Sequence, residues 1–467
     1  MMQIINNYLK QVLAFCLLSF PICCLNGATY ISPLDYGLKE ARTGVERFWA
    51  LYRVHLAAIE TDAAVDYRGI GDIDIEIPKD AKSVPLTSKT YFRGVRLTVL
   101  NNSKSFFLFE MAQPETTIDM APKNIDNASF HNYKPLRKGR SLLILEDENL
   151  WVKQRKGYNY GHTRRDILLV CEGRAQNAPI SAYNNSETKA KVSFVRVNNK
   201  KKRIDGIKFY RNEKSTQKTY LLNLNNQYNV IVSDIEIHTP QSSMIGDQAI
   251  RIGNCCCISF QDIKIDGTYS AVDNYGYGIS MNNVYDVRFK RLKSKSDWGI
   301  FGNNNVNNVT LANCDINRFD VHCYGKDIYM KKCVFRDLYN QFSSMKGEVV
   351  FDRCEFIDFT PFLYENSYNA YTRFNMVFID CVVYASKKRN YLIDARSLNG
   401  GETDERTELR VQQYPNLIIK GLKVVLGEDM DLYYSYKLGR NMEGWEQESL
   451  PGEAAFRKLK IVSSDRK

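Results

Sequence analysis

The fold is decided by one eight-residue pattern, which reads VIVSDIEI at residues 230–237 and ISFQDIKI at residues 258–265. Its order is apolar, any, apolar, any, polar or small, apolar, any, apolar. This alternation at period two predicts that each copy is a strand with one buried face. The other copies are KRIDGIKF (202–209, the weakest), VRFKRLKS (287–294), VTLANCDI (309–316), IYMKKCVF (328–335), VVFDRCEF (349–356), MVFIDCVV (376–383) and LIIKGLKV (417–424).

The spacing of these copies predicts a solenoid. Their starts lie 19 to 41 residues apart, and such recurrence is typical of repeat units that cover one another's apolar edges. Helical solenoids need a period of 3.6 residues, which the copies lack, and the leucine-asparagine signature of leucine-rich repeats is absent. The sequence therefore predicts an all-β chain folded as a parallel β-helix, with inward residues stacked about 4.8 Å apart.

Cysteine occupies the sixth position of the pattern in four successive copies. These residues are Cys314, Cys333, Cys354 and Cys381, where other copies have Ile or Leu. Because free cysteine behaves as a small hydrophobic residue, we expect a buried ladder of thiols. A chain of disulfides is the alternative, although stacked neighbours rarely have bridging geometry. The run Cys255–Cys257 is interpreted as packing at a coil corner rather than as metal ligands.

The N-terminal part differs from the repeats and resembles a known superfamily. Asp35-Tyr36-Gly37 is followed by an amphipathic helix expected from Thr43 to Ile59 and by a strand, IDIEI, ending at Pro78. This order resembles the entry segment of the pectate-lyase-like superfamily, although IPKD lacks that segment's glycine. The resemblance implies a right-handed β-helix closed by an N-terminal capping helix. It also implies a secreted bacterial polysaccharide lyase, of the Bacteroidetes type, with glycosaminoglycans among the expected substrates.

The composition fits a secreted globular protein with an anionic partner. The chain has 467 residues, a net charge of +11 and 44% hydrophobic residues, which excludes disorder and coiled coils. A positive balance suits an acidic polysaccharide or nucleic acid. No nucleic-acid-binding motif is present, and the expected export also argues against nucleic acid. We expect a monomer that binds an acidic polysaccharide.

The first residues predict export. Lys10 precedes an apolar stretch from Val12 to Phe20, and Ala28 is a plausible cleavage site for a signal peptide. The stretch is too short to span a membrane. We expect a secreted or periplasmic protein, and Cys23 and Cys24 leave a cell-surface lipoprotein open. The expected organisation is a signal peptide (1–28), an N-terminal cap with first coils (29–110), the parallel β-helix (111–425) and a C-terminal cap (426–467).

Short connections expose one face of the β-helix, and the segments 295–307 and 317–327 there carry most of the candidate site. We predict catalytic roles for His322, Arg318 and Tyr277, in which arginine neutralises an anionic group and histidine moves a proton. The predicted substrate-binding residues are Lys295, Asp297, Trp298, Asn303, Asn304, Asp320, Tyr275 and Arg251. In the alternative interpretation, the asparagines and carboxylates only satisfy backbone turns. Trp298 then fills the core instead of stacking on a sugar.

Three functions remain open. A polysaccharide lyase acting by β-elimination needs carboxylate neutralisation, a base and an acid, with His322 or a tyrosine as the base. A glycoside hydrolase needs a spaced carboxylate pair, and the motifs of polygalacturonases are missing. A binding solenoid without catalysis is the third. We expect no cofactor or metal, because Asp297 and Asp320 alone do not make a calcium site.

Overall fold

The computed structural model describes most of the chain between residues 24 and 426 and two short segments beyond. The described residues are 24–25, 28–121, 124–125, 128–152, 162–180, 190–211, 219–238, 248–266, 277–295, 299–342, 345–365, 373–385, 390–391, 393–396, 416–426, 432–433 and 459–463. The expected signal peptide lies almost entirely outside them. Within them, no helix is both long and apolar enough to cross a membrane.

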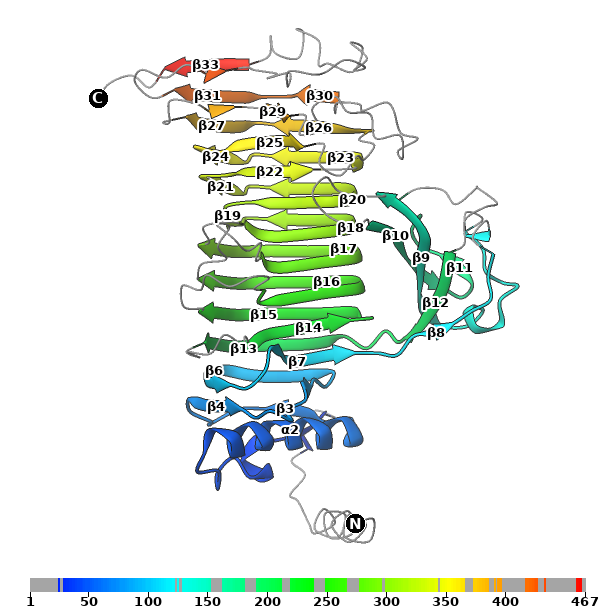
Figure 1. Ribbon diagram of the computed structural model, residues 1–467, viewed down its shortest axis with the longest axis vertical. Helices are drawn as coiled ribbons and strands as arrows, with labels where there is room; N and C mark the ends of the chain where they lie inside the picture. Colours follow the sequence, from blue (N-terminus) through cyan, green and yellow to red (C-terminus); the bar gives the residue numbers. More distant parts are fainter. Residues whose placement is uncertain are drawn as a thin grey trace.

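The predicted parallel β-helix is confirmed. The first residue of every repeat pairs in parallel register with the first residue of the next, from Lys202 with Val230 to Met376 with Leu417. Figure 1 shows the strands stacked as rungs along one axis. The strands that carry the repeat starts are β13 (Lys202–Arg211), β15 (Tyr228–His238), β16 (Ile250–Asp266), β17 (Tyr277–Lys295), β18 (Gly299–Ala312), β20 (Phe319–Lys331), β23 (Met345–Asp352), β26 (Arg373–Ile379) and β30 (Asn416–Ile419).

The fifth position of the pattern is a corner of the coil. In all nine copies this residue has a positive φ, for example 54° at Asp234 and 51° at Lys332. The left-handed conformation is open to Gly and tolerated by Asn and Asp, but it is unfavourable for β-branched residues. The requirement for a polar or small residue in the sequence pattern is therefore conformational. The corner residues are Gly206, Asp234, Asp262, Arg291, Asn313, Lys332, Arg353, Asp380 and Gly421.

Lys332 isolates this backbone effect, because its side chain is exposed and only its N–H is engaged, donating to the Asp352 carbonyl oxygen at 2.8 Å. We expect Lys332→Gly to raise the free energy of unfolding, and Lys332→Val to lower it, by about 1 kcal/mol each. Denaturant midpoints measure both. Lys423, exposed on strand β31 (Leu422–Leu426), is the control. Lys423→Gly should lower the free energy of unfolding and Lys423→Val should not, because the backbone is extended at this position. If glycine and valine rank in the same order at Lys332 and Lys423, the explanation is contradicted.

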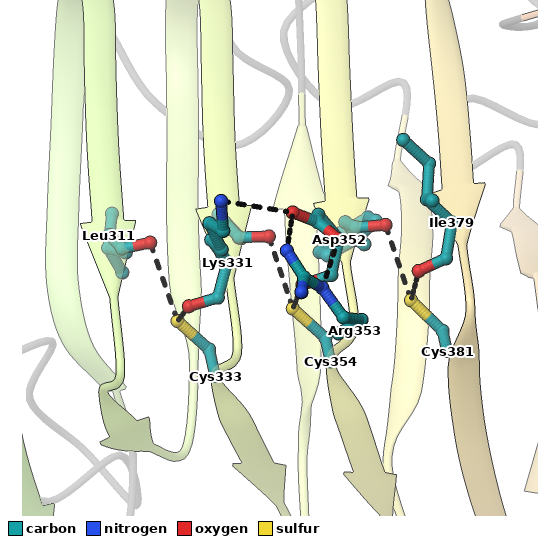
Figure 2. Close-up of polar contacts among 10 residues, drawn as sticks. Leu311, Lys331, Cys333, Asp352, Arg353, Cys354, Ile379 and Cys381 are labelled. Atoms are coloured by element: carbon teal, nitrogen blue, oxygen red, sulfur yellow. Dashed lines mark hydrogen bonds and ion pairs between the residues drawn. The ribbon is translucent and has the colours of Figure 1, made fainter.

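The four cysteines at the sixth position form the predicted thiol ladder. Cys314, Cys333, Cys354 and Cys381 are buried, and all four are free thiols. Figure 2 shows the sulfur atoms of three of them beside backbone carbonyls. The Cys354 Sγ, for instance, lies 3.2 Å from the carbonyl oxygen of Met330 on the preceding rung. Burial raises the pKa of the Cys354 thiol, so Cys354 packs as a neutral thiol.

The predicted capping helix is present as α2 (Gly44–Thr61). Thr43 is its N-cap: its side chain accepts from the Glu46 N–H at 3.2 Å, and Glu46 in turn accepts from the Thr43 N–H at 2.9 Å. The apolar face of α2 packs on the first strands and closes one end of the core (Figure 1). His55 is fully buried in this face, and its Nε2 lies 3.0 Å from the Tyr67 hydroxyl.

His55 makes the cap sensitive to acid. Burial lowers its pKa to about 3, whereas a histidine in an unfolded chain titrates near 6.5. Because the folded pKa is the lower one, stability is complete above about pH 6.5 and falls as the pH drops toward 3, by roughly 4 kcal/mol in total. We expect His55→Leu to flatten this part of the stability curve. Melting temperatures between pH 7 and 4 measure it, with His238→Leu on β15 as the control; equal slopes for both variants and wild type would contradict the assignment.

Residues 111–200 differ from the expectation. The sequence predicts coils of the β-helix with insertions here; the structure instead has a five-stranded antiparallel sheet in the order β11-β10-β9-β12-β8, inserted between β7 (Phe106–Ala112) and β13. Figure 1 shows this sheet beside the rungs β16 to β20. Its strands are β8 (Thr116–Thr117), β9 (Arg140–Val152), β10 (His162–Cys171), β11 (Arg174–Ala175) and β12 (Ala190–Val197).

The antiparallel sheet is docked on the β-helix by one apolar face. Leu142, Ile144 and Ile167 pack in one cluster with Tyr228 and Cys256 of the β-helix. The opposite face carries a second apolar cluster of its own. A strand that is apolar on both faces gives a continuous apolar run in the sequence, which does not show whether the strand pairs in parallel or antiparallel. The sequence therefore did not distinguish this sheet from coils of the β-helix.

Candidate functional site

Tyr277 and His322 meet on the outer face of the β-helix. The Tyr277 hydroxyl lies 2.9 Å from the His322 Nε2 and donates to the Asp320 Oδ2 at 3.2 Å. Tyr277 begins β17, whereas Asp320 and His322 lie on β20, two rungs further along. His322 retains 17% side-chain exposure, and Asp320 has none. A partly exposed phenol and imidazole in direct contact can exchange a proton with each other and with a ligand.

Arg318 is buried beneath this pair rather than available to a ligand. Its side chain is 2% exposed, and its Nε donates to the Asp320 Oδ1 at 2.6 Å. It also donates to the Gln341 Oε1 at 3.1 Å and lies 4.3 Å from the centre of the Tyr339 ring. Burial by itself would lower the pKa of Arg318, but the charge of Asp320 outweighs it and holds the pKa above its usual range. The expectation that Arg318 neutralises a substrate anion is corrected accordingly: it fixes Asp320.

Two glycines of the WGIFGNN segment provide the surface on which the Tyr277 ring lies. A Cβ atom at Gly302 would come within 3 Å of three atoms of that ring. A Cβ at Gly299 would lie 3.3 Å from Tyr277 Cε1 and 3.1 Å from Arg318 Cδ. Gly302 pairs with Asp320 in the register of β18 and β20. The missing side chain therefore lets Tyr277 reach across one rung to contact the next.

The other predicted ligand contacts on these rungs divide into buried and accessible ones. Asn303 is fully buried, and its amide donates to the Asp320 backbone oxygen at 2.7 Å. Asp320 is equally buried. Both residues therefore support the site from below, which corrects the expectation that they touch a ligand. Asn304 is partly exposed on β18, where it pairs with Cys323, the neighbour of His322.

Arg251 lies further away on the same face. Its exposed side chain is on β16, in a column that continues through Ser280 and Gly302 to Asp320. Three rung spacings separate it from Asp320, or about 14 Å. Lys295 ends β17, and only its backbone is described. Tyr275, Asp297 and Trp298 lie outside the described residues.

Two residues of the site, Tyr339 and Gln341 of β22 (Tyr339–Phe342), are not among those predicted from the sequence. Gln341 pairs with Asp320 in register and holds Arg318. The repeat starts at Ile328 and Val349 are 21 residues apart, the same offset as from Asp320 to Gln341. Adding this 21-residue offset to Asp320 therefore predicts that Gln341 lies next to it on the following rung.

No cluster of three or more potential metal-ligating side chains occurs among the described residues. At the site itself, the carboxylate of Asp320 is already bound by Arg318 and Tyr277. These residues do not resemble a calcium site, which draws on several carboxylate and carbonyl oxygens. That the protein works without a cofactor stays a prediction.

Comparisons with known proteins found the following. No protein-family model matches the chain. No curated protein matches it either. Among solved structures, it is similar to the tailspike gp49 of Pseudomonas phage LKA1, with 13% identity, a TM-score of 0.44 and coverage of 85% of this chain and 78% of that one.

Two further solved structures are similar to a comparable extent. One is the tailspike gp61 of Pseudomonas phage phi297, with 11% identity, a TM-score of 0.45 and coverage of 87% and 78%. The other is the gp54 tailspike of Acinetobacter baumannii bacteriophage AP22 in complex with A. baumannii capsular saccharide, with 11% identity, a TM-score of 0.42 and coverage of 93% and 75%. No family follows from these values. The function has to be argued from the site.

Proposed function

We propose that the protein cleaves a uronate-containing polysaccharide by β-elimination, with His322 as base and Tyr277 as acid. The observation that carries this proposal is the 2.9 Å contact between the Tyr277 hydroxyl and the His322 Nε2. β-Elimination removes the proton α to the uronate carboxylate and protonates the leaving glycosidic oxygen. An adjacent phenol and imidazole supply both proton transfers from one face of the sugar.

The roles follow from the neighbourhood of each group. Asp320 is paired with Arg318 and therefore carries a negative charge beside the Tyr277 hydroxyl. A second negative charge there is unfavourable, so Tyr277 is better suited to donate its proton than to start as a base. His322 then takes the α-proton. After the bond breaks, His322 holds one proton too many and Tyr277 one too few, and direct transfer across their contact restores both.

The uronate carboxylate still needs a neutralising partner. With Arg318 buried, we assign this task to the partly exposed Asn304, which pairs in register with Cys323, the neighbour of His322. Lys295 comes four residues before Gly299 in the chain, and we assign it to the same task. A hydrolase needs one carboxylic acid and one carboxylate at defined separation. Asp320 is fully buried and ion-paired, which favours the lyase over the hydrolase.

The test incubates the purified protein with hyaluronan, chondroitin sulfate, heparin, alginate and polygalacturonate. Ultraviolet absorbance and reducing ends are followed together, with and without chelator. We expect both signals to rise on at least one polymer, because elimination leaves an unsaturated uronate. Chelator should not change the rate.

Other outcomes would replace the proposal. Reducing ends without ultraviolet absorbance would mean hydrolysis. Binding without either signal would mean a carbohydrate-binding solenoid. A rate abolished by chelator would mean that a bound cation, rather than Asn304 and Lys295, neutralises the carboxylate.

A further inference from the structure

A polar pocket lies where the antiparallel sheet overhangs the β-helix. Glu146 is its centre, and the register places Arg165 of β10 and Lys191 of β12 on either side of it. Glu146 is two residues beyond Ile144, so its side chain is on the face that docks on the β-helix. The apolar contact ends here and a polar lining begins. Glu115, Ser193 and Asn254 complete the pocket, together with Ile144.

The charges of the pocket balance, because two carboxylates face two cations. Glu146 accepts from Arg165 Nη2 at 2.5 Å, and Glu115 accepts from Ser193 Oγ at 2.8 Å and Asn254 Nδ2 at 3.2 Å. The Lys191 side chain is exposed, and its ammonium group forms no hydrogen bond or ion pair within the described part of the chain. A pocket without net charge has no preference for an ion. Free N–H donors beside carboxylate acceptors match sugar hydroxyls, which both donate and accept.

The pocket adjoins the candidate site. The Arg165 N–H donates to the Asn305 Oδ1 at 3.4 Å, and Asn305 follows Gly302 by three residues on the same strand, β18. Asn254, which lines the pocket, is on β16, two rungs before β18. A polymer chain that binds at Tyr277 and His322 and extends along the outer face to Arg251 on β16 would therefore approach the pocket, because Asn254 follows Arg251 by three residues on that strand.

We propose that this pocket binds an uncharged, hydroxyl-rich sugar unit of the polymer cleaved at the candidate site. The inference rests on the proposed function and deepens it. It assigns the substrate to heteropolymers that alternate a uronate with an uncharged sugar, rather than to polymers of uronate alone.

The test measures binding in the Tyr277→Phe background, where cleavage does not interfere. Hyaluronan and chondroitin hexasaccharides are compared with a galacturonate oligomer of equal length by calorimetry. We expect Lys191→Ala and Glu146→Gln each to weaken binding of at least one heteropolymer hexasaccharide at least fivefold and to leave the galacturonate oligomer unchanged. Lys208→Ala, an exposed lysine on β13, is the matched control and should change neither.

The pocket assignment is overturned if the pocket variants weaken binding of the heteropolymer and galacturonate oligomers to the same extent, or weaken neither. It is also overturned if the Tyr277→Phe protein binds no heteropolymer. The assays separate the two proposals. If the wild type cleaves no polymer but the selective loss of binding is seen, the elimination mechanism fails and the pocket stands. If the wild type cleaves a heteropolymer and the pocket variants match it in KM and binding, the pocket alone fails.

Discussion

Tyr277→Phe is expected to lower kcat on the cleaved polymer by about two to four orders of magnitude, with a small change in KM. The substitution removes one hydroxyl, which contacts His322 at 2.9 Å and Asp320 at 3.2 Å, and keeps the ring on its glycine surface. Proton delivery to the leaving oxygen is lost, and with it the return of the proton from His322. Initial rates by ultraviolet absorbance measure the effect.

Tyr329→Phe is the matched control for this prediction, because Tyr329 is 38% exposed and lies on β20 beyond the candidate site. It should retain wild-type kcat. If Tyr277→Phe also stays within about threefold of wild type, Tyr277 has no role in the chemistry.

Gly302→Ala tests the same mechanism without touching a proton-carrying group. The added methyl would occupy space now filled by the Tyr277 ring and push the hydroxyl away from His322. We expect a large loss of kcat with a modest loss of stability. Gly71→Ala, where a Cβ would meet nothing within 4 Å, should leave activity unchanged. Full activity in Gly302→Ala would show that the observed position of Tyr277 is not required.

Asp320→Asn is expected to lower the free energy of unfolding by about 3–5 kcal/mol, because it leaves the charge of Arg318 buried and unpaired. Arg318 and Asp320 are 2% and 0% exposed, so water cannot replace the lost partner. Denaturant unfolding followed by circular dichroism measures the loss. The double variant Arg318→Met with Asp320→Asn should recover a large part of it, since no uncompensated charge remains.

Asp262→Asn is the control for the buried pair. Asp262 pairs with Arg291 through the same two side-chain types, but these are 43% and 40% exposed. Its loss should cost about 0–1 kcal/mol. Similar losses at both positions, or no recovery in the double variant, would show that the Arg318–Asp320 pair does not stabilise the site as its burial indicates.

The candidate site was predicted in composition but only partly in arrangement. His322 and Tyr277 stand out in the sequence as a rare histidine and a tyrosine between glycines, and the structure brings them together. Arg318 illustrates what the pattern could not show. It lies near Asp320 and His322 in the chain, yet its side chain is buried and its guanidinium lies 4.3 Å from the centre of the Tyr339 ring of β22. The alternation of apolar and polar residues assigns each side chain of a strand to the core or to the outer face. It does not show which outer-face side chains are covered by residues of other rungs.

The inserted sheet, and with it the pocket around Glu146, was not predicted for a related reason. Its two central strands carry continuous apolar runs, LLIL at 142–145 and ILLV at 167–170, and the strands of the sheet pair antiparallel with one another. Strand pairing over residues 116–197 depends on hairpin geometry and on docking against Tyr228 and Cys256. Neither leaves a periodic signal in the sequence.

The register of every repeat, the thiol ladder and the capping helix are predictable from local patterns in the sequence. Each of these depends on residues near in the chain or on a spacing that recurs: alternate burial for the strands, and an N-cap with an amphipathic face for the helix. Three other features are visible only in the tertiary structure: Arg318 is buried and binds Asp320, Gly302 leaves space for the Tyr277 ring, and a second sheet lies beside the β-helix. These depend on side chains from different rungs meeting at one place, which the lengths of the connecting loops set and local patterns do not encode.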